Sequence, residues 1–290
     1  MYTRRNVLAA IATLATAQLT DHACAEERNE LALQLAELER KSGGRLGVSI
    51  FDTASRRSTS HRGDERFPMC STFKLLAVAA LLRDVEQGRQ RLDRRIRFEP
   101  SDVVVNSLVT KDRAGGDGMT LSEICEAAMT YSDNTAGNLI LANIGGPQGL
   151  TAFARRIGDT TTRLDRIEPE LNEARPGDLR DTTTPSAMAG NVQTLALGKV
   201  LSDSSKNLIE KWLVGNKTGD ERLRAGLPAG WRCGDKTGAG ENGTTNDVGL
   251  IWPPNRKPII ASIFLTGTDA TSEQRNNILA NVGRLIAGTV

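Results

Sequence analysis

The alternation of hydrophobic and polar positions predicts ordered elements from close to the start of the chain. Near the N-terminus, leucines recur at helical spacing and the pattern stops at a Gly-Gly pair, which predicts a helix over residues 27–41. Residues 45–52 (RLGVSIFD) have the composition of a strand, and a polar turn at residues 55–57 would fold this strand into a hairpin. The chain is therefore expected to open with a helix and a hairpin.

The middle of the chain is patterned for helices. The stretch from Ser71 to Gly88 is apolar on nearly every side, so its helix is expected in a core. Thr120 and Glu123 have the spacing of a capping box and mark the start of another helix. Further helices are predicted over residues 134–144, 147–158, 184–201 and 204–215.

Strand patterns return near the C-terminus, before a final helix. The predicted strands are residues 231–237, 245–252 and 258–267, and the predicted helix is residues 272–287. Short connections between these strands favour antiparallel pairing.

These elements predict an α/β fold of the α+β type with two lobes. A five-stranded antiparallel sheet flanked by helices would be built from both chain ends, with an all-α lobe inserted between them. The expected α/β lobe comprises residues 26–62 and 216–290, and the helical lobe comprises residues 63–215. Catalytic residues would lie where the two lobes meet, which is a usual place for pockets.

Composition narrows the function without identifying it. The 290 residues are 39% hydrophobic and 25% charged, which is ordinary for a soluble globular protein. The net charge is only +2 and aromatic residues make up 4%, so we expect neither nucleic-acid attraction nor a base-stacking surface. The expected partners are small molecules, and the protein is expected to be a monomer.

Residues 1–25 have the layout of an export signal. Arg4 and Arg5 precede an apolar run too short to span a membrane, and small residues around Cys24 form a cleavage site. The adjacent arginines resemble a twin-arginine signal, and a general secretory signal that happens to carry two arginines is the alternative. We expect a periplasmic protein that begins near Glu26 and has no stable membrane association once the signal is removed.

Histidine and cysteine usage excludes some catalytic centres. Once the signal is removed, His61 is the only histidine, so a zinc hydrolase centre is not expected, and neither is any other metal or cofactor. Cys70, Cys125 and Cys233 remain, an odd number that leaves at least one thiol unpaired. Whether any two of them form a disulfide stays open. A serine nucleophile in this chain would need lysine or glutamate as its base.

Ser71 and Lys74 are the first candidates for chemistry. They are three positions apart, so on a helix their hydroxyl and amine would share a face. Burying a lysine is costly unless it is paired or used. The alternative is a helix N-terminus in which Ser71 or Thr72 is the cap and Lys74 reaches solvent.

Three further segments carry candidate polar groups. Residues 132–134 (SDN) follow a predicted helix, and an ordinary helix cap is their alternative interpretation. Residues 236–238 (KTG) lie in a predicted strand. Residues 163–172 (RLDRIEPELN) show little periodicity, and a solvated charged loop is their alternative interpretation.

Taken together and in this order, S-x-x-K, S-D-N and K-T-G resemble the signature of class A serine β-lactamases and penicillin-binding proteins. The resemblance covers nearly the whole mature chain and is strongest to the class A β-lactamases. It implies a sheet lobe beside a helical lobe. It also implies hydrolysis of the β-lactam amide of penicillin-type and some cephalosporin antibiotics, and hence antibiotic resistance.

The resemblance implies roles for five catalytic residues. Ser71 would be the nucleophile that forms an acyl-enzyme. Either Lys74, or Glu168 through a water, would be the base for acylation, and Glu168 would activate water for deacylation. Lys236 would lower the pKa of Lys74 by repulsion, and Ser132 would pass a proton to the departing ring nitrogen.

The resemblance also implies a set of binding residues. The backbone N–H groups of Ser71 and Ala239 would form the oxyanion hole. Asn134 would hold the substrate's side-chain amide, and Arg222 would reinforce carboxylate binding at an exposed rim, with a plain exposed charge as its alternative. The remaining residues are Asn172 beside the hydrolytic water, Lys236, Thr237 and Gly238 at the carboxylate, and the structural pair Arg166 and Asp181 that would bridge the ends of the Glu168 loop.

The chain departs from the family pattern at three places. Asn106 stands where most members place an aromatic at the cleft wall, which weakens the expected stacking on substrate. Val78 occupies the position of the usual disulfide partner of Cys125. Cys70 resembles the carbapenemase subgroup, but its partner position holds Gly240, so that disulfide cannot form and little carbapenem activity is expected.

Two rival functions remain. A D,D-peptidase or penicillin-binding protein shares the serine, the lysine and K-T-G, but Glu168 and Asn172 would add a mount for hydrolytic water. A non-catalytic β-lactam sensor is usually fused to transmembrane segments, and the sequence shows no such segment beyond the signal.

Overall fold

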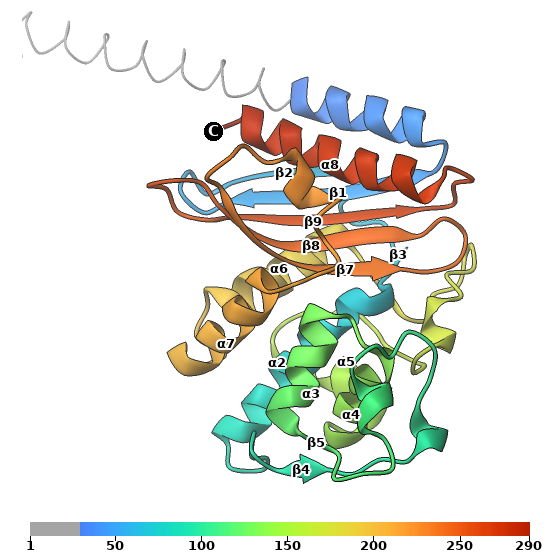
Figure 1. The fold of residues 1–290 in the computed structure, drawn as a ribbon. Coiled ribbons are helices and arrows are strands. Elements are labelled where there is room, and N and C mark those ends of the chain that lie inside the picture. Colours follow the sequence, from blue (N-terminus) through green and yellow to red (C-terminus); the bar gives the residue numbers. More distant parts are fainter. Residues whose placement is uncertain (1–29) are drawn as a thin grey trace, which may run out of the picture.

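The structure is a computed structural model that describes residues 30–290, in which a sheet with helices on both faces adjoins a group of helices (Figure 1). The predicted export signal and the start of the first predicted helix lie outside the described residues. Within them, the first helix runs from residue 30 to residue 42.

The sheet is antiparallel throughout, with the order β2-β1-β9-β8-β7, which confirms the predicted five-stranded sheet. Because β1 pairs with β9, segments from the two ends of the chain lie side by side at the centre of the sheet. The edge strand β7 continues to Ala239, beyond its predicted end at Thr237. The strands are β1 (Arg45–Asp52), β2 (Arg57–His61), β7 (Arg232–Ala239), β8 (Thr245–Trp252) and β9 (Ile259–Thr266).

Helices cover both faces of the sheet. The helix over residues 30–42 and α8 (Ser272–Gly288) run side by side over one face (Figure 1), and their leucine, valine and isoleucine side chains share a core with it. On the opposite face, α6 (Pro185–Ala196) packs against β9 and β1, and α7 (Asp203–Val214) packs against β7. Each face of the sheet therefore buries its apolar side chains against helices.

The second lobe is built around one buried helix, α2 (Phe73–Glu86). Its residues from Phe73 to Leu82 are all buried, which confirms the prediction of a core helix. The helix starts two residues later than predicted, because Ser71 lies in a preceding turn of 3₁₀ helix, η1 (Cys70–Thr72). Around α2 pack three further helices, α3 (Leu121–Thr130), α4 (Asn134–Asn143) and α5 (Gly146–Arg156).

Local signals are mostly confirmed. Thr120 and Glu123 form the predicted capping box at the start of α3. The helix predicted over residues 184–201 is shorter, because Thr184 is its cap and α6 ends at Ala196. The remaining 3₁₀ turns are η2 (Pro100–Asp102), η3 (Thr110–Arg113), η4 (Glu170–Asn172) and η5 (Leu223–Gly226).

The inserted lobe is not entirely helical, contrary to expectation. Two short ladders accompany its helices: β3 (Phe67–Pro68) pairs with β6 (Thr182–Thr183), and β4 (Arg95–Ile96) pairs with β5 (Met119–Thr120). Such two-residue strands carry too little alternation to be recognised in a sequence. The β3–β6 ladder joins the segment that precedes Ser71 to the end of the Glu168 loop.

None of the helices within residues 30–290 combines the length and the apolar character needed to cross a bilayer. In the same part of the chain, Cys70, Cys125 and Cys233 are buried, free thiols. Burial raises the pKa of the Cys70 thiol, so this side chain behaves as the small apolar group that its sequence context predicted.

Candidate active site

Ser71 lies in the turn that enters the central helix. Cys70 before it has a φ of 44°, a left-handed conformation that directs the chain from β3 into η1. Lys74, in the first turn of α2, is completely buried, and its Nζ donates a hydrogen bond of 2.8 Å to Ser71 Oγ. The alternative of a capped helix with Lys74 in solvent is therefore wrong, and Thr72 at the N-cap makes no capping bond.

Lys74 has more acceptors around it than it has N–H groups. Besides Ser71 Oγ, its Nζ lies 2.8 Å from the Ser132 carbonyl oxygen, 2.7 Å from Asn134 Oδ1 and 2.9 Å from Glu168 Oε1. An ammonium has three N–H groups, so these four acceptors compete for them. Burial lowers the pKa of Lys74, while the Glu168 carboxylate opposes this shift. The amine is thus placed to exchange a proton with Ser71 or Glu168.

Glu168 reaches the same hydroxyl from a different segment. Ser71 Oγ donates to Glu168 Oε1 over 3.2 Å, and Asn172 Nδ2 donates to the other carboxylate oxygen, Oε2. Glu168 as a whole is 1% exposed, so the alternative of a solvated charged loop is wrong for this residue. Its backbone is fixed as well: Glu168 N donates to Asn138 Oδ1 over 2.8 Å, and Asn138 Nδ2 donates to the Glu168 carbonyl over 2.9 Å.

The ends of the loop that carries Glu168 are held together around Asp181. Arg166 Nε lies 2.6 Å from Asp181 Oδ2, and the backbone N–H groups of Asp165 and Arg166 donate to Asp181 Oδ1 over 2.8 and 2.9 Å. The Asp181 carbonyl accepts a 2.9 Å bond from Met69 N. The neck of the loop is therefore tied directly to the segment that leads to Ser71.

In the segment Ser132–Asn134, Asp133 caps a helix and Ser132 contacts the two lysines of the site. Asp133 is a helix cap, as the alternative interpretation held, and accepts from Ala136 N over 2.9 Å at the start of α4. Ser132 has a φ of 57°, and its two neighbours in the site are both lysines: its carbonyl accepts from Lys74 and its Oγ accepts from Lys236. A plain cap is therefore an incomplete description of this segment.

Lys236 brings a second buried amine into the site from β7. Its Nζ donates to Ser132 Oγ over 2.9 Å and to the Thr237 carbonyl over 3.0 Å. Burial holds the pKa of Lys236 well below its ordinary value, and repulsion from Lys74 adds to this shift. Two amines of lowered pKa thus lie on opposite sides of Ser132, joined through its carbonyl and its hydroxyl.

Arg222 lies behind the end of β7 rather than at an exposed rim. Its Nη1 donates to the Gly238 carbonyl over 2.9 Å and to the Asn246 carbonyl over 2.8 Å, and its Nε donates to Asn276 Oδ1 over 3.1 Å. Burial lowers the pKa of Arg222. The expectation of a freely exposed contact is therefore corrected: this guanidinium braces the strand that carries Lys236 and Thr237.

The far end of β7 closes onto the Ser71 turn. An added Cβ at Gly238 would lie 2.8 Å from the Met69 carbonyl oxygen, so only glycine allows this approach. Ala239 follows at the end of the strand, and the Thr237 hydroxyl is hydrogen-bonded to Thr218. The two segments whose N–H groups were expected to form the oxyanion hole, those of Ser71 and Ala239, are therefore in contact.

Two positions that depart from the family pattern border this region. Asn106 has a φ of 60°, and its carbonyl accepts from Asn134 N over 3.1 Å, so it adjoins the site through its backbone. An added Cβ at Gly240 would lie 2.7 Å from Cys70 Sγ. Gly240 therefore does face Cys70, as the resemblance implied, but it offers no sulfur.

Sequence reasoning missed Asn138 and Asn246, which touch the backbone around the catalytic residues. Asn138 lies one turn after Asn134 on α4, and this i, i+4 spacing was a usable signal for a shared face. Asn246 carries no comparable signal, because its partners come from Pro68 and Met69, far away in sequence.

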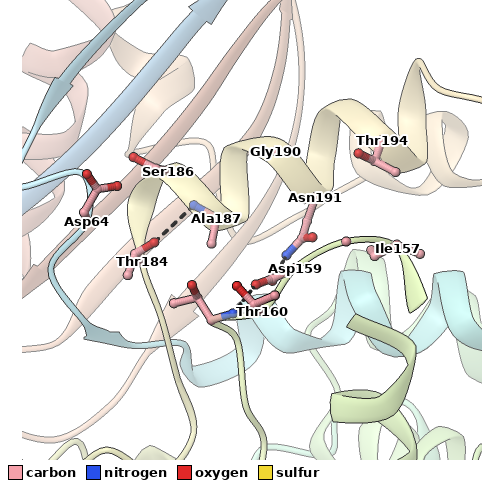
Figure 2. Close-up of a pocket in the computed structure, with 12 residues that line it drawn as sticks. Asp64, Ile157, Asp159, Thr160, Thr184, Ser186, Ala187, Gly190, Asn191 and Thr194 are labelled. Carbon is pink, nitrogen blue, oxygen red and sulfur yellow. Dashed lines mark hydrogen bonds between the residues drawn. The ribbon is translucent and has the colours of Figure 1, made fainter. Parts of the chain in front are cut away.

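A cavity of about 370 Å³ contains none of the expected site residues (Figure 2). Its central carboxylate, that of Asp159, accepts bonds from Thr161 N, Thr162 N and Asn191 Nδ2 over 2.7, 2.9 and 2.6 Å. These bonds join the turn after α5 to α6, so Asp159 is fully used in holding elements together. Within residues 30–290, no group of three His, Cys, Asp or Glu side chains is arranged to hold a metal.

The site brings a serine hydroxyl into contact with a lysine amine and a glutamate carboxylate. A sequence profile of the Beta-lactamase enzyme family matches residues 30–290. Beta-lactamase OXY-1 of Klebsiella oxytoca is 48% identical over 253 residues, which are 87% of each chain. Beta-lactamase Toho-1 of Escherichia coli is 46% identical over 285 residues, 98% of this chain and 97% of its relative.

A solved structure gives the same answer. An ancestral (GNCA) class A beta-lactamase superposes with a TM-score of 0.89 at 59% identity, covering 90% of this chain and all of the other. The chain belongs to the class A β-lactamase family.

Proposed function

We propose that the protein hydrolyses the β-lactam amide of penicillin-type antibiotics and some cephalosporins through an acyl ester on Ser71, and so confers resistance. The observation that carries the proposal is the position of the Glu168 carboxylate, 3.2 Å from Ser71 Oγ, with Asn172 bonded to the carboxylate and Asn138 to the Glu168 backbone. A base fixed beside the nucleophile supports hydrolysis of the ester, and not only its formation.

In acylation, Ser71 Oγ attacks the β-lactam carbonyl and loses its proton. Lys74 Nζ at 2.8 Å and Glu168 Oε1 at 3.2 Å both lie close to this oxygen, so each is a base for this step, Lys74 directly and Glu168 directly or through a water. The depressed pKa of Lys74 favours a neutral amine that accepts the proton. An O–C bond forms, and the negative charge on the carbonyl oxygen is met by the N–H groups of Ser71 and Ala239.

The amide bond then breaks, and the ring nitrogen must gain a proton. Ser132 carries it, because its hydroxyl contacts Lys236 and its carbonyl contacts Lys74, which place the hydroxyl between the two amines. Lys236, Thr237 and Gly238 receive the carboxylate of the substrate, while Asn134 holds its side-chain amide. Arg222 supports the carboxylate site from behind, through the carbonyl of Gly238.

In deacylation, Glu168 removes a proton from a water that attacks the ester carbonyl. An O–C bond forms to the water oxygen, the bond to Ser71 Oγ breaks, and the proton returns to Ser71. Asn172 orients the carboxylate and helps to hold the water. A D,D-peptidase would lack this mount, so the alternative function is not supported.

We also infer that the enzyme is exported to the periplasm as a monomer, with Arg4 and Arg5 as a twin-arginine signal and no stable membrane association after its removal. The glycine at position 240 leaves Cys70 without a disulfide partner, and Asn106 supplies no aromatic surface. Both features support a penicillinase spectrum with little turnover of carbapenems.

The test is hydrolysis of a panel of penicillins, cephalosporins and a carbapenem by the purified mature protein, beside an acyl-D-alanyl-D-alanine peptide. We expect rapid penicillin hydrolysis, no peptide cleavage, and complete loss of activity in Ser71→Ala. Cleavage of the peptide, or stoichiometric acylation by penicillin without turnover, would assign the protein to the D,D-peptidases instead.

A further inference from the structure

Met69, two residues before the nucleophilic serine, is held from two directions through its backbone N–H and its carbonyl. Met69 N donates to the Asp181 carbonyl of the Glu168 loop over 2.9 Å. Met69 O accepts from Thr72 Oγ1 over 2.8 Å, within the turn, and from Asn246 Nδ2 over 3.1 Å, from strand β8. The position of the Ser71 N–H therefore depends on Met69, because only Cys70, in a left-handed conformation, intervenes.

Asn246 is the link between this turn and the sheet. Its side chain is completely buried, and Nδ2 donates to the Pro68 carbonyl over 2.9 Å as well as to that of Met69. It lies opposite Gly238 in the β7–β8 ladder. Its own backbone carbonyl accepts from Arg222 Nη1 over 2.8 Å. One residue thus contacts the serine turn through its side chain and the arginine through its backbone.

The chemistry of the position calls for a short amide. Two carbonyl oxygens converge on Nδ2, so a donor with two N–H groups satisfies both, whereas a carboxylate would repel them. Asn246 Oδ1 is buried without a partner among the described residues. A buried acceptor left unpaired costs stability, so a residue chosen for stability alone would not be expected here.

The Met69 carbonyl also limits how closely β7 approaches the Ser71 turn. The Cβ that an alanine would place at Gly238 would lie 2.8 Å from Met69 O and 3.1 Å from Asn246 Nδ2. Ala239 follows Gly238 directly. The positions of the Ala239 N–H and the Ser71 N–H therefore both depend on the position of the Met69 carbonyl. The bond from Asn246 fixes the distance between the two segments that supply these N–H groups.

We propose that Asn246 is a positioning residue of the oxyanion hole, which sets the spacing of its two N–H donors and connects that spacing to Arg222. The proposal rests on the proposed function, because it concerns the acyl ester on Ser71. Removing one oxyanion-hole donor typically costs about 10²–10³-fold in kcat, so a misaligned pair is expected to cost about tenfold or more. The loss should fall on kcat for both half-reactions, with KM little changed.

The test uses Asn246→Leu, which has nearly the same shape and no donor, in the full-length mature enzyme. In a Glu168→Gln background, the penicilloyl ester is trapped and the infrared stretch of its carbonyl is recorded. A carbonyl polarised by the oxyanion hole absorbs at lower frequency, so Asn246→Leu should shift the band to higher frequency. Affinity for phenylboronic acid, whose tetrahedral adduct places an oxygen in the hole, should fall in proportion to kcat.

Asn276→Leu is the matched control, because Asn276 contacts Arg222 Nε and lies outside the serine turn. It should alter KM and leave the ester band in place. Should Asn246→Leu fail to fold, Asn246→Ala supplies the same measurement, because it also removes both N–H donors and keeps the backbone bond to Arg222. An unshifted ester band in a folded variant overturns the inference alone. Failure of Glu168→Gln to trap any ester would overturn the proposed function instead.

Discussion

Lys74 Nζ and Glu168 Oε1 lie 2.9 Å apart, and neither side chain is exposed to solvent. The two side chains therefore form a buried ion pair beside Ser71. The Glu168 carboxylate is the largest influence that raises the pKa of Lys74 against the effect of burial. Loss of the carboxylate should leave a lysine that is even more easily deprotonated, and hence still a base for Ser71.

Glu168→Ala should therefore separate the two half-reactions. Lys74 can still accept the serine proton, so acylation continues, while hydrolysis of the ester loses its base and slows by about 10²–10⁴-fold. Intact-mass spectrometry after mixing with a penicillin should show one persistent covalent adduct. Ser71→Ala should show none. Turnover of Glu168→Ala at the wild-type rate would contradict the role given to Glu168.

Lys236 predicts opposite trends of activity and stability with pH. Its pKa lies well below the ordinary lysine value, so its charge is lost as pH rises through that lowered pKa, and kcat/KM should fall at a pH where an ordinary lysine stays charged. Over the same window the unfolded chain binds more protons than the folded one, so this group's contribution to the free energy of unfolding rises with pH.

Lys236→Arg is the matching variant, because an arginine keeps its charge at high pH. Its alkaline limb of kcat/KM should move to higher pH, and the associated rise in stability should vanish. Both are measured by pH profiles of initial rates and of urea unfolding. An alkaline limb that stays in place in Lys236→Arg would assign that limb to another group.

Asn138→Ala should impair deacylation without removing any group that touches the substrate. Asn138 makes two hydrogen bonds to the backbone of Glu168, and a misplacement of about 1 Å in a catalytic group costs up to about 10²-fold. Burst kinetics should show normal acylation and slow steady-state turnover. Asn143→Ala, on the same helix but without contact to Glu168, is the control and should behave as wild type. Steady-state turnover at the wild-type rate in Asn138→Ala would contradict a role for Asn138 in placing Glu168.

Gly240→Cys should create a disulfide with Cys70. The added Cβ would lie 2.7 Å from Cys70 Sγ, close to the separation of about 3 Å that a disulfide requires, although it also crowds the Asn172 carbonyl. Thiol titration of the denatured, unreduced protein should find no more free thiols than Cys125 and Cys233 supply. The melting temperature should rise and return to the starting value with reductant. If the cysteines at positions 70 and 240 also titrate as free thiols, the disulfide has not formed and β7 does not shift enough to allow it.

Arg4→Lys combined with Arg5→Lys should retain active enzyme in the cytoplasm if these residues form a twin-arginine signal. Living cells should then lose resistance to penicillin, while whole-cell lysates keep hydrolytic activity. A single exposed charge elsewhere, such as Arg97→Lys, provides the control for general effects on expression. Undiminished periplasmic activity would point to the general secretory route.

The sequence predicted the sheet well because each of its main strands is a long run of alternating or apolar residues between turn signals. It predicted Ser71, Lys74, Ser132 and Lys236 as one site only through the order of the motifs, since no local pattern brings them together. The lysines' burial was foreseeable in part: an apolar run around Lys74 predicts a core helix. The two-residue ladders could not be foreseen, because they are products of tertiary packing.

Arg222 shows where sequence reasoning failed. The resemblance implied that Arg222 reinforces carboxylate binding, and we expected this contact at an exposed rim, with a plain exposed charge as the alternative. The structure instead gives it one carbonyl acceptor on β7 (Gly238), one on β8 (Asn246) and a third partner in Asn276. These partners lie on strands and a helix later in the chain, so nothing near Arg222 in sequence announces them.

The central pairing of β1 with β9 has a consequence for folding during synthesis of the chain. Arg45 at the start of β1 faces Thr266 at the end of β9, so the sheet cannot close until the ribosome has made nearly the whole polypeptide. Such distant pairings fold slowly. During synthesis, the side of β1 that will pair with β9 therefore stays unpaired. A transport system that accepts only folded proteins would export this chain only after its synthesis is nearly complete. In cells with scarce chaperones, the amount of active enzyme should fall while the rate of its synthesis is unchanged.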